Sequence, residues 1–241
     1  MSGSLKVFLA FCVVVAASAA IAVIWLGPQM LTMVLDDEQR EKPMYALHFA
    51  RYDSIDEAAW KSAYATPMSV LMQAVGGQSQ WQGDLLRVVQ GRRSDEWRVL
   101  ELVRFPLAGE VVQSVTSAEF RALASPETGF DRMFVATQSV PARALDFGAI
   151  CVILIEAPDA KAEHHRDLTA NVAPHGGTVV WDTAVHVLDI GADEAWNRVI
   201  VVGFESEGAA EAWVLDAGSM TERSIASVRF RELAALVFSA G

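Results

Sequence analysis

The sequence has few of the residues that build disulfide frameworks and metal sites. It contains 2 cysteines and 5 histidines in 241 residues. Cys12 falls within an apolar N-terminal run and Cys151 opens a strand-like segment, so we expect no disulfide between them. Neither a Cys-x-x-Cys nor a His-x-x-x-His spacing occurs. We therefore predict no metal site and no bound cofactor.

Acidic residues are missing from the N-terminal part of the chain. No Asp or Glu precedes Asp36, and Lys6 is the only basic residue before it. The whole chain nevertheless has a formal net charge of −11, so the remainder is strongly acidic. A surface of that sign repels phosphate backbones, and we expect no nucleic-acid partner. Hydrophobic residues make up 52% of the sequence, which is enough for a packed core.

The N-terminal apolar run is typical of a membrane anchor. Residues 7–26 contain no charged side chain. A helix of that length spans ~30 Å, the thickness of the hydrocarbon layer of a bilayer. We predict that residues 7–26 cross the lipid bilayer once and that residues 1–42 form an anchor and juxtamembrane linker. A cleaved signal peptide ending near Ala17-Ser18-Ala19 is the alternative. Lys6 on the short N-terminal tail favours the inner (plasma) membrane with the folded part in the periplasm.

A pattern in the first part of the folded region recurs about one hundred residues later. Gly76-Gly77 followed by Trp81 is repeated as Gly176-Gly177 followed by Trp181. The segment 44–49 matches 150–155, which aligns His48 with Leu154. We predict two repeats, residues 43–142 and residues 148–241.

Each repeat has the same predicted order of elements, β-α-β-β-α-β. In the first repeat the elements are a strand at 44–52, a helix at 55–75, strands at 79–90 and 97–105, a helix at 107–123 and a strand at 132–139. In the second they are a strand at 149–156, a helix at 159–174, strands at 178–189 and 196–204, a helix at 207–217 and a strand at 230–238. This is the ferredoxin-like order, so the predicted class is α+β. We expect the two repeats to form an α+β barrel within one chain.

The residues around the Gly-Gly pairs carry a resemblance to a known superfamily. In the first repeat these are Gly76, Gly77 and the run Arg104-Phe105-Pro106; in the second, Gly176, Gly177 and Phe204 match, whereas Gly203 and Glu205 depart. The pattern resembles the dimeric α+β barrel superfamily, and most closely its small domains of unknown function. That resemblance implies a fold that hosts cofactor-independent monooxygenases, isomerases and haem-dependent chlorite dismutases. Haem is therefore an alternative to the expected absence of a cofactor.

Two residues are candidates for catalysis. His48 lies mid-strand and could face a cavity between sheet and helices as a base or haem ligand, or be a hydrogen-bonded histidine at a strand edge. Glu101 interrupts an apolar strand, where burial would raise its pKa. The alternative is a solvated face or an ion pair with Arg87, Arg98 or Arg104. Ile200 is its equivalent in the second repeat.

Aromatic and histidine side chains supply weaker candidates. Trp81, Trp181 and His186 are candidate ligand-binding residues, although packing in the core is the alternative for each. His164, His165 and His175 do not have the spacing of a metal-binding set.

The sequence supports two classes of function. We expect a membrane-tethered, non-catalytic accessory or ligand-binding protein, with integral membrane proteins as candidate partners in a larger complex. The anchor and the lack of a phosphate loop or nucleophile motif favour it. The alternative is a cofactor-independent or haem-dependent enzyme of the oxygenase or isomerase type. It requires a polar pocket at His48 or Glu101.

Overall fold

The computed structural model describes residues 31–32, 35–52, 57–90, 97–115, 117–123, 130–156, 165–190, 196–217 and 232–240. The strands are β1 (Leu31–Thr32), β2 (Met44–Tyr52), β3 (Gln78–Gln90), β4 (Val99–Phe105), β5 (Phe130–Thr137), β6 (Ala149–Glu156), β7 (Gly177–Ala184), β8 (Val187–Ile190), β9 (Arg198–Phe204) and β10 (Glu232–Ala240). The helices are α2 (Asp37–Arg40), α3 (Glu57–Trp60), the π-helical turn η1 (Lys61–Ala65), α4 (Thr66–Ala74), α5 (Ala108–Val115), α6 (Ala118–Leu123), α7 (His165–Val172), the 3-10 turn η4 (Ala173–His175) and α8 (Glu207–Ala217).

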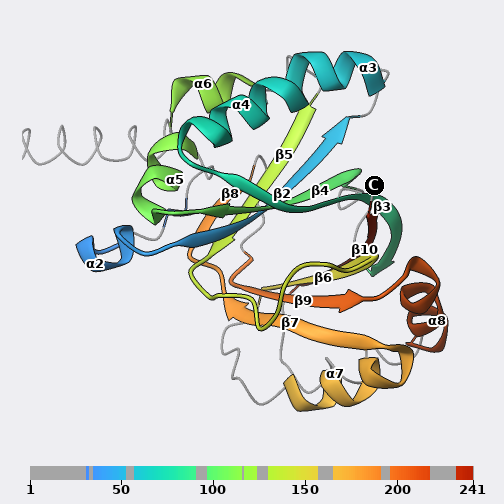
Figure 1. Cartoon of the computed structure of the whole chain (residues 1–241). Coiled ribbons are helices and arrows are strands. Elements are labelled where there is room, and N and C mark those ends of the chain that lie inside the picture. The colour runs from blue at the N-terminus through green and yellow to red at the C-terminus, as the bar shows by residue number, and fades with distance from the viewer. Residues whose placement is uncertain are drawn as a thin grey trace, which may run out of the picture.

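The strands form one curled antiparallel sheet in the order β1-β8-β5-β2-β4-β3-β10-β6-β9-β7 (Figure 1). Two strand pairings, β3 with β10 and β5 with β8, join the first half of the chain, β2 to β5, with the second half, β6 to β10. The beginning of β3 pairs with β4, and the rest of it continues alongside β10. In the second half, β7 pairs with β9, and β8 then pairs with β5. The class is therefore α+β, as predicted, while the limits of the two repeats stay a prediction.

The inner face of the curled sheet is the largest apolar cluster. Alternate residues of each strand point inward, because successive side chains of a strand face opposite sides. In β2 these are Tyr45, Leu47 and Phe49, and they meet inward residues of the second half such as Val152 and Phe238. Both faces of β2, β6 and β9 are covered, so these strands are apolar almost throughout, whereas β3 carries many polar residues.

Helices cover the outer face in two separate layers (Figure 1). The helices α3 to α6 pack on the outward residues of β2, β4 and β5. Those of the second half, α7 and α8, pack on β6 and β9. Three predicted elements differ in detail. The predicted helix 55–75 contains a π-helical turn, the predicted helix 107–123 is two helices, and the predicted strand 178–189 is broken between β7 and β8.

The Gly-Gly pairs end a helix and begin a strand in each half. Gly76 and Gly176 have φ of 74° and 72°, the left-handed conformation that favours glycine at a helix C-terminus. At Gly77 a Cβ would lie 2.7 Å from the carbonyl oxygen of Met72 and 2.7 Å from the ring of Phe105. The pair therefore lets the chain turn tightly against the next strand.

The predicted anchor, residues 7–26, lies outside the described residues. Among the helices of the described ranges, none has the length and apolar character needed to cross a membrane.

Candidate functional site

His48 lies in the middle of β2, a strand flanked on both sides by β4 and β5. It shares the outer face with Met44, Ala46 and Ala50, so its ring points into the layer between the sheet and the first set of helices. The residue is 5% exposed. It is therefore not a histidine at a strand edge, and it occupies the position between sheet and helices that the sequence suggested.

Tyr64 reaches His48 from the helix above. The hydroxyl of Tyr64 lies 2.7 Å from Nε2 of His48, and Tyr64 is fully buried. Tyr64 belongs to the π-helical turn, in which the N–H of Thr66 bonds the carbonyl of Lys61. Pro67 follows directly; it has no N–H to donate, and its ring would crowd a regular helical turn. The wider turn accommodates this proline, and such turns are frequent at functional sites.

The spacing of the buried residues on this helix also fits a wider turn. Trp60, Tyr64, Met68 and Met72 are all buried and four residues apart. In a regular α-helix each step of four drifts by about 40° around the axis. The π-helical turn takes up part of that drift, so both Tyr64 and Met68 stay directed at the sheet.

Glu101 stands directly opposite His48 on β4, because the two residues are register partners. Its Oε2 lies 3.9 Å from Nδ1 of His48, with 21% of the Glu101 side chain and 6% of the His48 side chain exposed. Burial by itself would raise the pKa of Glu101. The neighbouring His48 and Ser79 side chains, which favour the charged carboxylate, outweigh it, so the pKa lies below its usual value. Glu101 therefore pairs with His48 and not with an arginine.

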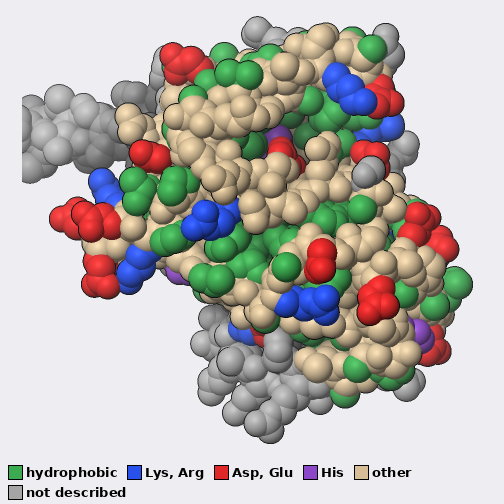
Figure 2. Space-filling model, in the orientation of Figure 1, with side chains coloured by type: hydrophobic (Ala, Val, Ile, Leu, Met, Phe, Trp, Pro, Cys, Tyr) green, Lys and Arg blue, Asp and Glu red, His purple; other side chains and the backbone are tan. Residues whose placement is uncertain are grey.

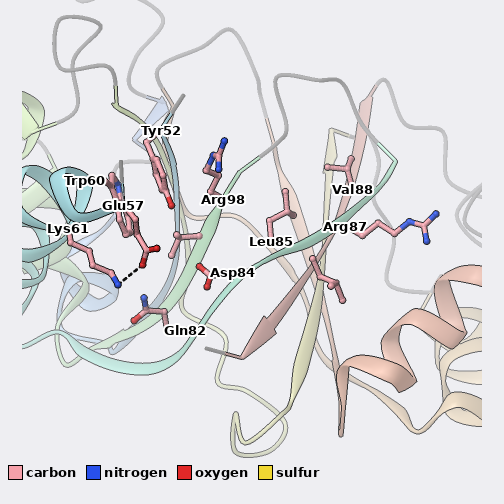
Figure 3. A pocket seen from close by; sticks show the side chains of 12 residues that line it. Tyr52, Glu57, Trp60, Lys61, Gln82, Asp84, Leu85, Arg87, Val88 and Arg98 are labelled. Atoms are coloured by element: carbon pink, nitrogen blue, oxygen red, sulfur yellow. Dashed lines mark ion pairs between the residues drawn. The ribbon is translucent and has the colours of Figure 1, made fainter. Parts of the chain in front are cut away.

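A hollow opens beside this pair. It has a volume of about 760 Å³ and lies between the beginning of the first helix and strands β3 and β4. Its lining residues are Tyr52, Glu57, Trp60, Lys61, Gln82, Asp84, Leu85, Leu86, Arg87, Val88, Arg98 and Val99 (Figure 3). Gln82 is the register partner of Glu101 on β3, which places the hollow next to the carboxylate. Figure 2 shows a recess under the helices with histidine and acidic atoms at its bottom.

Charged and aromatic groups share the walls of the hollow. Lys61 and Glu57 form an ion pair of 2.6 Å across one turn of helix (Figure 3). The guanidinium of Arg98 lies 4.9 Å from the ring centre of Tyr52. The hollow can therefore offer both hydrogen-bond donors and hydrogen-bond acceptors to a small polar molecule.

The second half lacks this arrangement. The strand registers make Ile153 and Ile200 the counterparts of His48 and Glu101, and these two isoleucines are themselves partners. The alignment of His48 with Leu154 was wrong by one residue, because Leu154 faces the inner side of the sheet. The counterparts of Gln82 and Val99 are Asp182 and Arg198, which form a buried ion pair. Where the described part of the first half has the pair His48 and Glu101, the described part of the second half has an isoleucine pair beside a buried ion pair.

The weaker candidates lie apart from this site. Trp81 and Trp181 both belong to the inner-face cluster. The indole N–H of Trp81 donates to the carbonyl of Phe147 at 2.8 Å. His186 is at the break between β7 and β8, 3.4 Å from the hydroxyl of Thr137, and burial lowers its pKa. None of the three joins His48 and Glu101, and their role in ligand binding stays a prediction.

No group of three or more His, Cys, Asp or Glu residues that could hold a metal ion occurs in the described ranges. Haem does not fit His48 either, because its Nε2 faces the Tyr64 hydroxyl at 2.7 Å within a packed layer. An axial iron ligand needs that nitrogen free, with room for a macrocycle beside it. We therefore assign no step to haem.

Tyr64, Ser79 and Gln82 are site residues that were not identified from the sequence. The strict four-residue spacing leading to Pro67 was the available signal for the π-helical turn that positions Tyr64. A β-bulge between Ser79 and Trp81 sets the register in which Gln82 is opposite Glu101. The alternation of polar and apolar residues along a strand does not predict such a bulge.

Solved structures with a similar fold include a candidate monooxygenase from Lactobacillus acidophilus NCFM, with 10% identity, a TM-score of 0.44 and coverage of 83% of this chain and 94% of that one. An anthrone oxidase-like protein has 8% identity, a TM-score of 0.48 and coverage of 88% and 94%. A mutant chlorite dismutase from Candidatus Nitrospira defluvii has 11% identity, a TM-score of 0.47 and coverage of 83% and 91%. No family model matches the sequence, and no curated protein is significantly similar to it.

The likeness to these structures concerns the fold alone, a curled antiparallel sheet of the kind that the resemblance to the dimeric α+β barrel superfamily implied. The expectation of a non-catalytic accessory protein was wrong, whereas the membrane attachment through residues 7–26 stays a prediction. The structures that this chain is similar to are named as monooxygenase-like, anthrone oxidase-like and chlorite dismutase proteins. His48 and Glu101 are register partners, and the hollow next to them is lined by Gln82, the partner of Glu101 on β3, but by neither His48 nor Glu101.

Proposed function

We propose that this protein is an enzyme of the oxygenase or isomerase type that begins by removing a proton from a carbon or oxygen acid. The observation that carries the proposal is the buried set of Glu101, His48 and Tyr64 beside a hollow, in one half of the chain only. Reactions of both types can start with a proton transfer, and positioned carboxylates and imidazoles perform that step.

The exposed fractions of the three side chains suggest their order. Glu101 is the outermost and Tyr64 the innermost, so Glu101 is the group that meets the substrate. When Tyr64 donates its hydroxyl hydrogen to Nε2, the hydrogen of the neutral imidazole is on Nδ1 and faces Glu101. His48 is then a positioning residue: it orients the carboxylate and stabilises its charge. The separation of 3.9 Å would shorten when substrate closes the hollow.

The electrostatics of the pair favour a carboxylate that is ready to accept a proton. The lowered pKa keeps Glu101 ionised in the free protein. A substrate in the hollow displaces water from the carboxylate, which disfavours its charged form and strengthens it as a base. Glu101 is therefore ionised at rest and a stronger base in the complex.

Two parts of the proposal concern the whole chain. We propose that the curled sheet is a barrel closed within one chain, because β3 pairs with β10 and β5 with β8 across the two halves. We also propose that residues 7–26 attach the enzyme to the inner membrane with its folded part in the periplasm, since that stretch is uncharged and long enough to span a bilayer. Integral membrane proteins are proposed neighbours in that location.

Hydrogen–deuterium exchange tests the proton transfer without knowledge of the natural substrate. The full chain is incubated in deuterated buffer with 2-tetralone, a β-keto ester and a naphthol, and deuterium uptake is followed by NMR. We expect accelerated exchange for at least one probe, and Glu101→Gln should reduce it by about 10²–10⁴-fold. Ile200→Val, at the matching position of the second half, should leave the rate unchanged. Equal rates in Glu101→Gln and the wild type would refute the role of Glu101.

A further inference from the structure

Three oxidisable aromatic rings form a row from the hollow to His48. The ring centres of Tyr52 and Trp60 are 4.9 Å apart at an interplanar angle of 24°. Those of Trp60 and Tyr64 are 6.3 Å apart at 27°. Tyr52 and Trp60 line the hollow, whereas Tyr64 is fully buried. The row therefore connects a site where a small molecule can bind with a tyrosine that no solvent reaches.

Tyr64 has the partner that a redox-active tyrosine needs. A tyrosine that loses an electron becomes a strong acid, and an uncompensated charge is costly in the interior. Its proton must therefore leave with the electron, along an existing hydrogen bond. The Nε2 of His48 is 2.7 Å from the Tyr64 hydroxyl and can accept that proton. Glu101, the cross-strand partner of His48, stabilises the imidazolium that results.

Charges at the two ends of the row favour oxidation of Tyr64 over oxidation of Tyr52. The guanidinium of Arg98 lies 4.9 Å from the ring centre of Tyr52, and a cation there disfavours loss of an electron from that ring. The carboxylate of Glu101 is at the other end, next to His48. When a ring at the hollow is oxidised, it therefore takes an electron from the next ring inward, until Tyr64 is the oxidised residue.

We propose that Tyr64 is a redox-active tyrosine that donates one electron, through Trp60 and Tyr52, to an oxygen-centred radical of the peroxyl class in the hollow, which becomes a peroxide anion. The radical gains the electron, the O–H bond of Tyr64 breaks, and its proton moves to Nε2 of His48. A neutral tyrosyl radical beside an imidazolium remains. This second activity does not rest on proton abstraction by Glu101, because it requires no acidic substrate.

The chain is well suited to a spectroscopic test, because it has 3 tyrosines in all. The full chain is photo-oxidised with tris(bipyridine)ruthenium and a sacrificial electron acceptor, freeze-trapped and measured by electron paramagnetic resonance. We expect one neutral tyrosyl signal that disappears in Tyr64→Phe. Tyr45 lies in the inner-face cluster, away from the row, so Tyr45→Phe is the matched control and should keep the signal.

Two further variants test the proton transfer to His48 and the electron transfer through Trp60. His48→Gln removes the base, and the lifetime of the tyrosyl signal should fall about tenfold, the change that corresponds to loss of one charge-assisted hydrogen bond. Trp60→Leu should slow the appearance of the Tyr64 signal without changing its shape. A signal that persists in Tyr64→Phe, or an unchanged lifetime in His48→Gln, would overturn the proposal. Neither measurement depends on deuterium exchange, so the two proposals can fail separately.

Discussion

Replacing His48 and Glu101 by isoleucine, the residue at both matching positions of the second half, separates their effect on stability from their effect on function. The second half has Ile153 and Ile200 where the first has His48 and Glu101. The variant is His48→Ile with Glu101→Ile, and Tyr64→Phe is added because the hydroxyl of Tyr64 would otherwise lose its contact with His48. His48 and Glu101 are on the outer face of the sheet, and Tyr64 packs on them from the helical layer.

The expected magnitudes follow from burial. His48→Ile alone leaves the carboxylate of Glu101, 79% of which is covered, without the imidazole, and Glu101→Ile alone leaves the imidazole without its carboxylate. Each single change should lower the free energy of unfolding by about 1–3 kcal/mol, the cost of a buried polar group that loses its partner. The triple variant leaves no such group. It should be as stable as the wild type or up to about 4 kcal/mol more stable.

Urea-induced unfolding of the full chain, followed by tryptophan fluorescence, measures these differences. The same series is assayed for deuterium exchange, which should be absent from every variant that lacks Glu101. The reciprocal change, Ile153→His with Ile200→Glu, is the matched control. It should cost more than about 3 kcal/mol, because it buries a charge in an apolar layer.

One result would refute the reasoning. If the triple variant were destabilised by the sum of the single changes, the pair would contribute through packing and not through mutual satisfaction of polar groups. A triple variant that kept its exchange activity would remove Glu101 and His48 from the mechanism.

Four other outcomes are expected. Folding lowers the pKa of Glu101, so its contribution to the free energy of unfolding is complete above the unfolded-state pKa and disappears as the pH falls through the folded-state pKa. In Glu101→Gln, the free energy of unfolding should therefore depend less on pH in that range, which circular dichroism at acid pH measures. Arg198→Val leaves Asp182 as a buried carboxylate and should cost about 3–5 kcal/mol in urea unfolding, and adding Asp182→Gln should restore most of it. Gly77→Ala should cost about 1–3 kcal/mol in the same assay, because the new methyl meets backbone at 2.7 Å. Alkaline carbonate extraction of membranes should leave the chain in the pellet, and deletion of residues 7–26 should release it.

The sequence by itself determined the elements and much of their order. Apolar runs located strands such as β2, β6 and β9, because both faces of these strands are covered. The Gly-Gly pairs located the helix ends, since Gly76 and Gly176 adopt a conformation that other residues avoid. His48 and Glu101 were selected for the same local reason, as polar side chains within apolar strands.

Only the tertiary structure decided that these residues form one site. A one-residue change of register would send His48 to the inner face, and the register depends on partner strands far away in the sequence. Tyr64 meets His48 through a π-helical turn; the four-residue spacing is compatible with that turn, but it does not show that Tyr64 meets His48. The difference between the halves, a hollow in one and the Arg198–Asp182 pair in the other, depends on which side chains meet after folding. Local pattern therefore specifies the elements, whereas contacts distant in sequence specify the chemistry.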